Sequence, residues 1–441
     1  METFLIKALQ LIVSLSILVL VHEFGHFIFA RIFKVRVEKF YIFFDPWFAL
    51  FKYKPKNSDT EYGVGWLPLG GYCKISGMID ESFDTEQMAQ PPKPYEFRSK
   101  PAWQRLLIMT AGVIFNFILA IVIYSMVLFH WGDTYLPLKN VTMGMGYSEL
   151  LHDVGFRDGD ILVAADGEEL ERFDDINLRK IIEGSEATVL RNGQKVQIPI
   201  PDDMMRRLLR EKTWFAEYRF PMVVGELADD SPAKAAGMLV NDSIVSVNGV
   251  ATLANTEVTK ALQENKGKEV EIGLYRNGQE MTLTASLDST GLLGFYAKSP
   301  FAIYKTEKKT YNFFTSFPAG IVHGVNTLKG YASDMKYAFT KEGASSLGGF
   351  GTIGQLFPAK WNWLAFWERT AFLSIILAFM NILPIPALDG GYVMFLLYEV
   401  ITRRKPSDKF LEYANMVGLF ILFGLLIYAN GNDLVRYLFN K

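Results

Sequence analysis

The sequence predicts a polytopic α-helical membrane protein of about four spans, with two tandem α+β domains outside the cytoplasm. Two features predict this fold class. Long apolar runs carry almost no charge, and one patterned segment occurs twice between the second run and the third. The average composition, with 50 % hydrophobic and 21 % charged residues, would also suit many soluble enzymes. The distribution of the apolar residues along the chain is therefore more informative than their number.

Three apolar runs are each long enough for a membrane-spanning helix. Residues 8–30 contain a single formal charge, Glu23, and residues 106–131 and 413–432 contain none. A helix needs roughly 20 residues to cross the hydrocarbon core. We therefore expect a span in each run.

A fourth span is predicted to be broken. Residues 361–383 are apolar after Glu368 and Arg369, and the apolar character continues past Pro384 and Pro386 to residue 400. An open backbone inside a membrane is tolerated only where protein or a cavity surrounds it. The break is therefore a place where a polar group can point into a cavity.

Charge and cysteine content exclude several classes of protein. Lysine and arginine number 45 against 47 for aspartate and glutamate, so the net charge is −2. A general nucleic-acid-binding protein would show a strong basic excess. The single cysteine, Cys73, excludes an intramolecular disulfide and a multi-cysteine metal cluster.

The distribution of basic residues predicts the orientation. Lysines and arginines are concentrated between the first two spans and just before the last one. Loops rich in these residues stay in the cytoplasm. The long segment between the second and third spans is then extracytoplasmic, together with both termini.

The extracytoplasmic segment contains an internal repeat. The stretch from Gly155 to Gly167 aligns with that from Gly237 to Gly249, and Arg-Asn-Gly-Gln occurs at 191–194 and again at 276–279. Each copy predicts a turn, a strand, an Asx-Gly turn, a helix and a hairpin. This pattern resembles PDZ domains, which bind an extended peptide at a sheet edge. The alternative is a β-rich domain without a ligand that acts as a spacer or steric filter.

An HExxH motif lies inside the first span. His22 and His26 share one face of a helix about one turn apart, and Glu23 lies between them. Two imidazoles can occupy two corners of a zinc site, and the glutamate can act as general base. The alternative is a hydrogen-bonded polar patch near the cytoplasmic end of the span. Three polar groups within five residues of a span nevertheless require a specific reason.

A third ligand must come from a distant part of the sequence. Asp389, in the broken span, is the best-placed carboxylate, because two prolines open the backbone before it. The alternative is that Asp389 caps the restarted helix. The spacing leaves both interpretations open.

Taken together, these motifs resemble the site-2 protease family of intramembrane zinc metalloproteases. The resemblance rests on HExxH in the first span, Asn381-x-x-Pro-x-Pro-x-Leu-Asp-Gly390 in a late span and the paired PDZ-like repeats. It implies that Zn2+ is bound by His22, His26 and Asp389, and that Glu23 is the catalytic base.

The resemblance also implies residues that position substrate. The segment 67–74 is similar to a membrane-dipping β-hairpin loop of the family, so Gly70, Gly71 and Tyr72 are expected beside the substrate. Asn116 and Asn381 are further candidates, although hydrogen bonding between helices is an equal alternative. Val113 stands where the family has a proline.

The resemblance implies cleavage of single-span, anti-sigma-factor-like membrane proteins that are already shortened outside the membrane, as part of regulated intramembrane proteolysis in an envelope stress response. Leftover signal peptides are a further candidate class of substrate. The expected location is the bacterial inner membrane, in contact with the lipid bilayer but not with nucleic acid, and with the active site towards the cytoplasm. The alternatives are an inactive membrane-tethered PDZ scaffold and a metal transporter. We expect the first span at 1–32, a β-hairpin region at 33–103, the second span at 104–131, PDZ-like domains at 132–215 and 216–300, interfacial amphipathic helices at 301–358, the broken span at 359–401 and the last span at 410–432.

Overall fold

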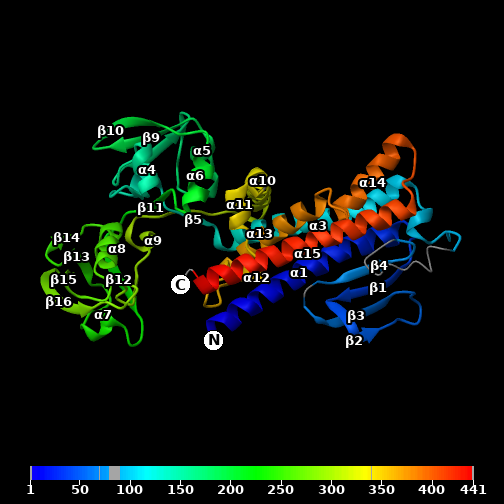
Figure 1. Cartoon of the computed structure of the whole chain (residues 1–441), viewed down its shortest axis with the longest axis horizontal. Helices are drawn as coiled ribbons and strands as arrows, with labels where there is room; N and C mark the ends of the chain where they lie inside the picture. Colours follow the sequence, from blue (N-terminus) through cyan, green and yellow to red (C-terminus); the bar gives the residue numbers. More distant parts are fainter. Residues whose placement is uncertain (1, 69, 79–89, 339, 440–441) are drawn as a thin grey trace. The chain divides into compact units, whose positions relative to one another are not determined.

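The computed structural model describes residues 2–68, 70–78, 90–338 and 340–439 (Figure 1). The chain forms two compact units. One contains the residues up to Gly132 together with those from Thr310 onward, and the other is Asp133–Lys309.

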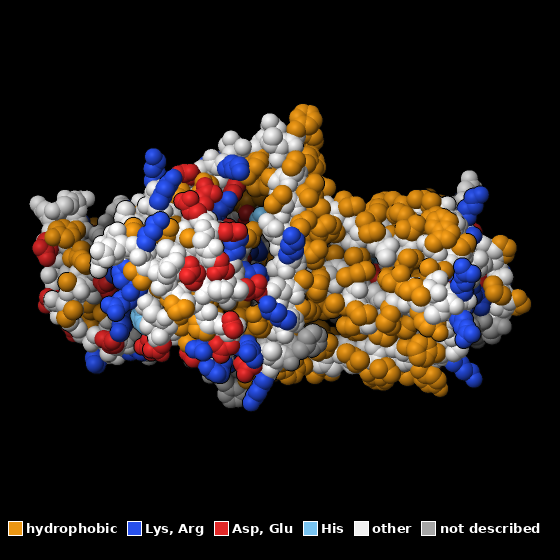
Figure 2. Space-filling model, turned by 90° about the horizontal axis from the view of Figure 1, so that it is seen from above, with side chains coloured by type: hydrophobic (Ala, Val, Ile, Leu, Met, Phe, Trp, Pro, Cys, Tyr) orange, Lys and Arg blue, Asp and Glu red, His pale blue; other side chains and the backbone are white. Residues whose placement is uncertain are grey.

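Four helices of the first unit are long and apolar enough to cross a membrane, among the residues described. They are α1 (Glu2–Ile32), α3 (Ala102–Trp131), α13 (Trp363–Ile382) and α15 (Asp408–Phe439). The prediction of about four spans is therefore confirmed by length and composition. Figure 2 shows a broad hydrophobic surface over the right-hand part of the view, with lysines and arginines gathered at its outer end.

Helix α3 is the centre of this unit, because α1, α13 and α14 (Asp389–Thr402) all pack against it. Small residues allow the closest approach. A Cβ added at Gly25 of α1 would lie 2.7 Å from the carbonyl oxygen of Ala111 in α3. Close approach at small residues is how membrane helices gain packing energy without a hydrophobic driving force.

The predicted break in the third span lies between α13 and α14, at residues 383–388. Pro384 and Pro386 have no N–H to donate to a helix. Ala387 has a positive φ of 74°, which is rare for a residue with a side chain. Glycines at 390 and 391 let the new helix start directly against this segment, because a Cβ at either position would overlap its backbone.

The region after α1 is a four-stranded mixed sheet of order β2-β3-β1-β4. Its strands are β1 (Val37–Ile42), β2 (Phe44–Tyr53), β3 (Glu61–Leu67) and β4 (Tyr72–Ile75). The expectation of a hairpin at 67–74 was wrong, because β1 lies between β3 and β4 and pairs parallel to β3 and antiparallel to β4. The hairpin of this sheet is β2–β3. The short helix η1 (Phe97–Ser99) precedes α3.

Three helices precede α13: α10 (Phe313–Ala338), α11 (Lys341–Ser346) and α12 (Phe350–Gln355). Helix α10 packs along α3, with Gly320 against Ser125 and Gly324 against Tyr124. The end of α15 fixes the segment between α11 and α12. There the Asp433 carboxylate accepts hydrogen bonds from the backbone N–H groups of Gly349 and Thr352, each at 2.9 Å.

The second unit contains two modules, each with its own hydrophobic core. The first has a sheet of order β10-β9-β7-β8, and the second a sheet of order β16-β15-β13-β12-β17 with β14 paired to β13. The first comprises β5 (Asp133–Tyr135), η2 (Leu138–Asn140), β6 (Met145–Tyr147), α4 (Glu149–Val154), β7 (Ile161–Ala165), β8 (Glu168–Glu169), α5 (Asp175–Glu183), β9 (Glu186–Arg191), β10 (Gln194–Pro199), α6 (Met204–Glu211) and β11 (Ala216–Tyr218). The second comprises β12 (Met222–Leu227), α7 (Pro232–Ala235), β13 (Ser243–Val247), β14 (Val250–Ala251), α8 (Asn255–Glu264), β15 (Glu269–Arg276), β16 (Gln279–Ser286) and β17 (Phe295–Ala297), followed by α9 (Pro300–Ile303) and β18 (Glu307–Lys309).

The internal repeat corresponds to the same order of elements in both modules: strand, Asx-Gly turn, short strand, helix and hairpin. One ion pair also recurs. Arg191 binds the buried Asp160 at 2.7 Å, and Arg276 binds the buried Asp242 at 2.6 Å. Each arginine also donates to the carbonyl of the glycine that begins the motif, at 2.8 Å. The Gly, Asp and Arg that recur in the two copies therefore make the same tertiary contact.

Candidate metal centre

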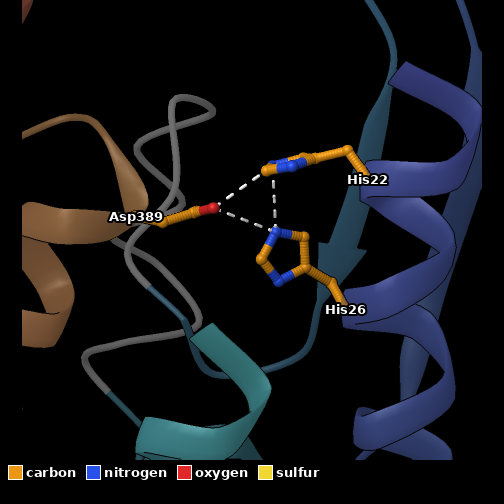
Figure 3. A group of neighbouring side chains, drawn as sticks. All are labelled: His22, His26 and Asp389. Atoms are coloured by element: carbon orange, nitrogen blue, oxygen red, sulfur yellow. Dashed lines mark hydrogen bonds and ion pairs between the residues drawn. The ribbon is translucent and has the colours of Figure 1, made fainter. Parts of the chain in front are cut away.

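His22 and His26 project from the same face of α1, as the i, i+4 spacing predicts (Figure 3). Both side chains are buried, with 7 % and 6 % of their surfaces exposed. Their Nε2 atoms are 3.2 Å apart. Two imidazoles therefore converge on one point inside the helix bundle.

Asp389 reaches the same point from the first turn of α14 (Figure 3). Its Oδ2 lies 3.2 Å from Nε2 of His22 and 3.3 Å from Nε2 of His26. Zinc bonds of about 2.0–2.1 Å in a tetrahedron place neighbouring ligand atoms roughly 3.3 Å apart. The three measured separations match that edge length, so this donor set fits a zinc ion with one or more positions left for water or substrate.

Each histidine ring has a polar neighbour at Nδ1, on its outer side, and His22 has a further one at Nε2, on the side of the site. Nδ1 of His26 lies 2.8 Å from the carbonyl oxygen of Ile108, which can only accept. Nδ1 must therefore carry the proton, and Nε2 presents its lone pair to the site. The Asn116 amide lies 3.2 Å from Nδ1 of His22, and the Asn381 amide lies 3.4 Å from Nε2 of the same ring.

The two asparagines predicted from sequence thus lie against a histidine. Asn116 is fully buried, and its backbone carbonyl accepts a hydrogen bond from Ser374 of α13 at 2.7 Å. Asn116 therefore connects the histidine ring to two other helices. Its predicted role in positioning substrate stays a prediction.

Glu23 follows His22 directly on α1, and its side chain is half-buried. Successive residues of a helix differ by about 100° in direction, so Glu23 leaves α1 beside the histidine face. Its role as general base remains a prediction.

Gly112 is a site residue to which sequence reasoning assigned no role. A Cβ at this position of α3 would lie 2.5 Å from Nε2 of His26 and 2.6 Å from Cε1 of His22. Only glycine leaves room for both rings. The available signal was the similarity of residues 111–116 to a Gly-Pro-x-x-Asn element of the family, in which Gly112 stands at the glycine and Val113 at the proline.

Gly70, Gly71 and Tyr72 lie at the start of β4, an edge strand of the sheet. A Cβ at Gly71 would lie 2.6 Å from the carbonyl oxygen of Tyr41 and 3.0 Å from Val19, one turn before His22 on α1. Tyr72 stacks on Tyr41 and donates a hydrogen bond to Asp45 at 2.8 Å. Gly71 therefore allows the start of the edge strand to lie against the helix that carries the histidines, and Tyr72 fixes that strand within the sheet.

The whole chain is similar to known proteins. The model of peptidase family M50 matches residues 10–425. A putative zinc metalloprotease of Borreliella burgdorferi is 28 % identical over 96 % of this chain and 97 % of its own length. The regulator of sigma-E protease RseP of Escherichia coli is 28 % identical over 99 % of this chain and 100 % of its own length. The metalloprotease MmpA of Caulobacter vibrioides is 26 % identical over 98 % and 96 %.

Proposed function

Because the chain belongs to peptidase family M50 and is a zinc metalloprotease, we propose that His22, His26 and Asp389 hold the zinc ion and that Glu23 is the general base. The observation that carries this assignment is the triangle of three buried ligand atoms, 3.2–3.3 Å apart, between helices α1 and α14. The family makes the protein an intramembrane protease, and the site lies within apolar helices.

In this proposal Glu23 transfers protons, and residues of α3 hold the histidine rings. When bound, zinc polarises the scissile carbonyl and lowers the pKa of the attacking water. Glu23 accepts the proton of that water and passes it to the leaving amine. The carbonyl of Ile108 and the amide of Asn116 keep the histidine rings in place, so the site need not reorganise during the reaction.

We propose that the substrate binds as an added strand beside β4. A peptide carbonyl in a helix is hydrogen-bonded and shielded, so a substrate helix must open before it is cut. Strand β4 pairs only with β1 among the described strands. Its start also packs on α1 one turn from His22. Backbone hydrogen bonds to this edge would hold an unwound segment near the site.

The proposed substrates are single-span membrane proteins that have already been shortened outside the membrane. Their cleavage would form part of an envelope stress response. The name of the Escherichia coli relative, regulator of sigma-E protease, supports a part in the regulation of a sigma factor. We place the second unit in the periplasm and the metal centre towards the cytoplasm, because basic residues are concentrated between α1 and α3. The two modules, proposed as PDZ domains, would exclude substrates with bulky outer domains.

Reconstitution in liposomes with a single-span substrate tests the proposal. We expect the parent protein to cleave it, a zinc chelator to stop cleavage and added zinc to restore it. Glu23→Gln should retain zinc but lose roughly 10²–10⁴-fold in rate, the usual contribution of a general base. Glu412→Gln, a matched change in α15, should behave like the parent.

Two results would contradict the assignment. Cleavage by Glu23→Gln at the parent rate would exclude Glu23 as the base. Cleavage by chelated protein that contains no measurable zinc would exclude a zinc mechanism at this site.

A further inference from the structure

Helix α15 makes little buried contact with the rest of its unit. Among its residues with described side chains, 409–438, only Asn415 and Gly418 are buried. These two positions are three apart in the sequence (i and i+3), so they lie on the same face of the helix. An asparagine within a membrane span is unfavourable unless it has partners, so its burial at this point needs a reason.

The partners of Asn415 belong to the segment that carries Asp389. Its side-chain Oδ1 accepts a hydrogen bond from the backbone N–H of Ala387 at 3.3 Å. Its Nδ2 donates to the hydroxyl of Tyr392, one turn into α14, at 2.8 Å. Asn415 therefore contacts the chain on both sides of Asp389.

Gly418 brings the same face of α15 close to the break. A Cβ at this position would overlap the carbonyl group of Pro386. The neighbouring Ala387 has the positive φ of 74° that lets the chain turn into α14. Non-glycine residues hold such a conformation only where surrounding contacts impose it. The contacts of Asn415 and Gly418 supply such a constraint.

We propose that Asn415 is a positioning residue for the third zinc ligand: it fixes the turn at Ala387 and the first turn of α14, and so sets where the Asp389 carboxylate points. The inference rests on the proposed function, in which Asp389 binds zinc. It gives the fourth span a part in the metal centre although that span supplies no ligand.

The test measures zinc affinity by chelator competition, and the coordination geometry by the visible spectrum of the Co2+-substituted full-length protein in detergent. Asn415→Leu removes both hydrogen bonds and replaces the amide with an apolar side chain of similar size. We expect its zinc dissociation constant to rise about tenfold, the lower end of the effect of losing an outer partner of a metal site. Its Co2+ spectrum should shift, and excess zinc should restore much of the cleavage rate.

Asn430→Leu is the matched control, because Asn430 lies on the same helix and contacts Phe350 instead of the Asp389 segment. It should bind zinc as the parent does. Tyr392→Phe removes one of the two side-chain contacts and should weaken zinc binding less than Asn415→Leu does. It also provides the test if Asn415→Leu fails to fold.

Each outcome has a clear meaning. His22→Ala should lose zinc; if it binds zinc as tightly as the parent, the proposed metal centre is wrong. If His22→Ala loses zinc while folded Asn415→Leu keeps the parent affinity and spectrum, the role of Asn415 is refuted and the metal centre stands. If Asn415→Leu does not fold, parent-like zinc binding by Tyr392→Phe refutes that role.

Discussion

Replacing Gly112 with alanine should disable the metal centre through a single methyl group. That Cβ would lie 2.5 Å from Nε2 of His26 and 2.6 Å from Cε1 of His22. Real Cβ contacts begin at 3.0 Å and become ordinary at 3.4 Å, so a ring must move by about 0.5–0.9 Å. His26 cannot move freely, because its Nδ1 is held at 2.8 Å from the carbonyl of Ile108.

A displacement of this size has a predictable cost. Misplacing catalytic groups by about 1 Å can lower a rate about 10²-fold. At about 1.36 kcal/mol for each factor of ten, this corresponds to about 2.7 kcal/mol of transition-state stabilisation. Alanine also favours a helix over glycine by roughly 0.5–1 kcal/mol, so α3 itself should not be weakened. We therefore expect a folded protein with reduced zinc content and a cleavage rate lowered about 10²-fold.

The assay compares zinc content, thermal unfolding and cleavage for Gly112→Ala and Gly424→Ala. Gly424 lies in α15, and a Cβ there meets nothing within 4 Å. The control should therefore retain parent zinc content and rate. Parent-like zinc content and cleavage in Gly112→Ala would refute the close packing of α3 against the two histidines.

Three other changes test separate parts of the structure. Asn116→Leu should weaken zinc binding about tenfold in chelator competition, because His22 loses the amide at its Nδ1; unchanged affinity would mean that Asn116 does not orient the ring. Arg105→Gln should lower the stability of the first unit by about 2 kcal/mol in thermal unfolding, because it leaves half-buried Glu399 without its charged partner at 2.5 Å. The double change with Glu399→Gln should recover part of this loss, and no recovery would exclude the pair as the cause. In the second module, burial raises the pKa of Asp242, but the hydrogen bond and charge of Arg276 outweigh it, so the pKa lies below its usual value. This contact therefore stabilises the module above the unfolded pKa of about 3.9 and is lost as the pH falls through the folded value. The protection of residues 222–298 against hydrogen exchange, taken relative to the intrinsic rate at each pH, should fall in that acid range, and Asp242→Asn should lower this protection at pH 7 and make it less dependent on acid.

Local signals explain what could be predicted from the sequence. The HExxH spacing places two rings on one helix face whatever the helix packs against, as Figure 3 shows for His22 and His26. The Asx-Gly turns of the repeat require a positive φ, which Asn192, Asn248 and Asn277 all adopt. These turns were therefore sufficient to predict the order of strands and helix in each module.

Non-local pairing explains what could not be predicted. Strand β1 pairs parallel to β3 and separates it from β4, so the segment 67–74 crosses the sheet instead of forming a hairpin. A parallel pair leaves no tight turn in the sequence to mark it. The spacing likewise did not decide whether Asp389 is a metal ligand or a helix cap. The position of its side chain depends on how α14 packs against α3.

Helix α3 explains why ligands so far apart in sequence can meet. It contributes none of the three proposed ligands, yet it contacts each helix that carries one. Gly112, Ile108 and Asn116 fix the two rings of α1, while the ion pair of Arg105 with Glu399 ties α14 to the first turn of α3. A shift of α1 or α14 along α3 would change the 3.2–3.3 Å separations before it exposed much apolar surface. Zinc affinity should therefore respond to helix packing more sensitively than overall stability does, and for that reason the variants above are compared by zinc binding together with unfolding.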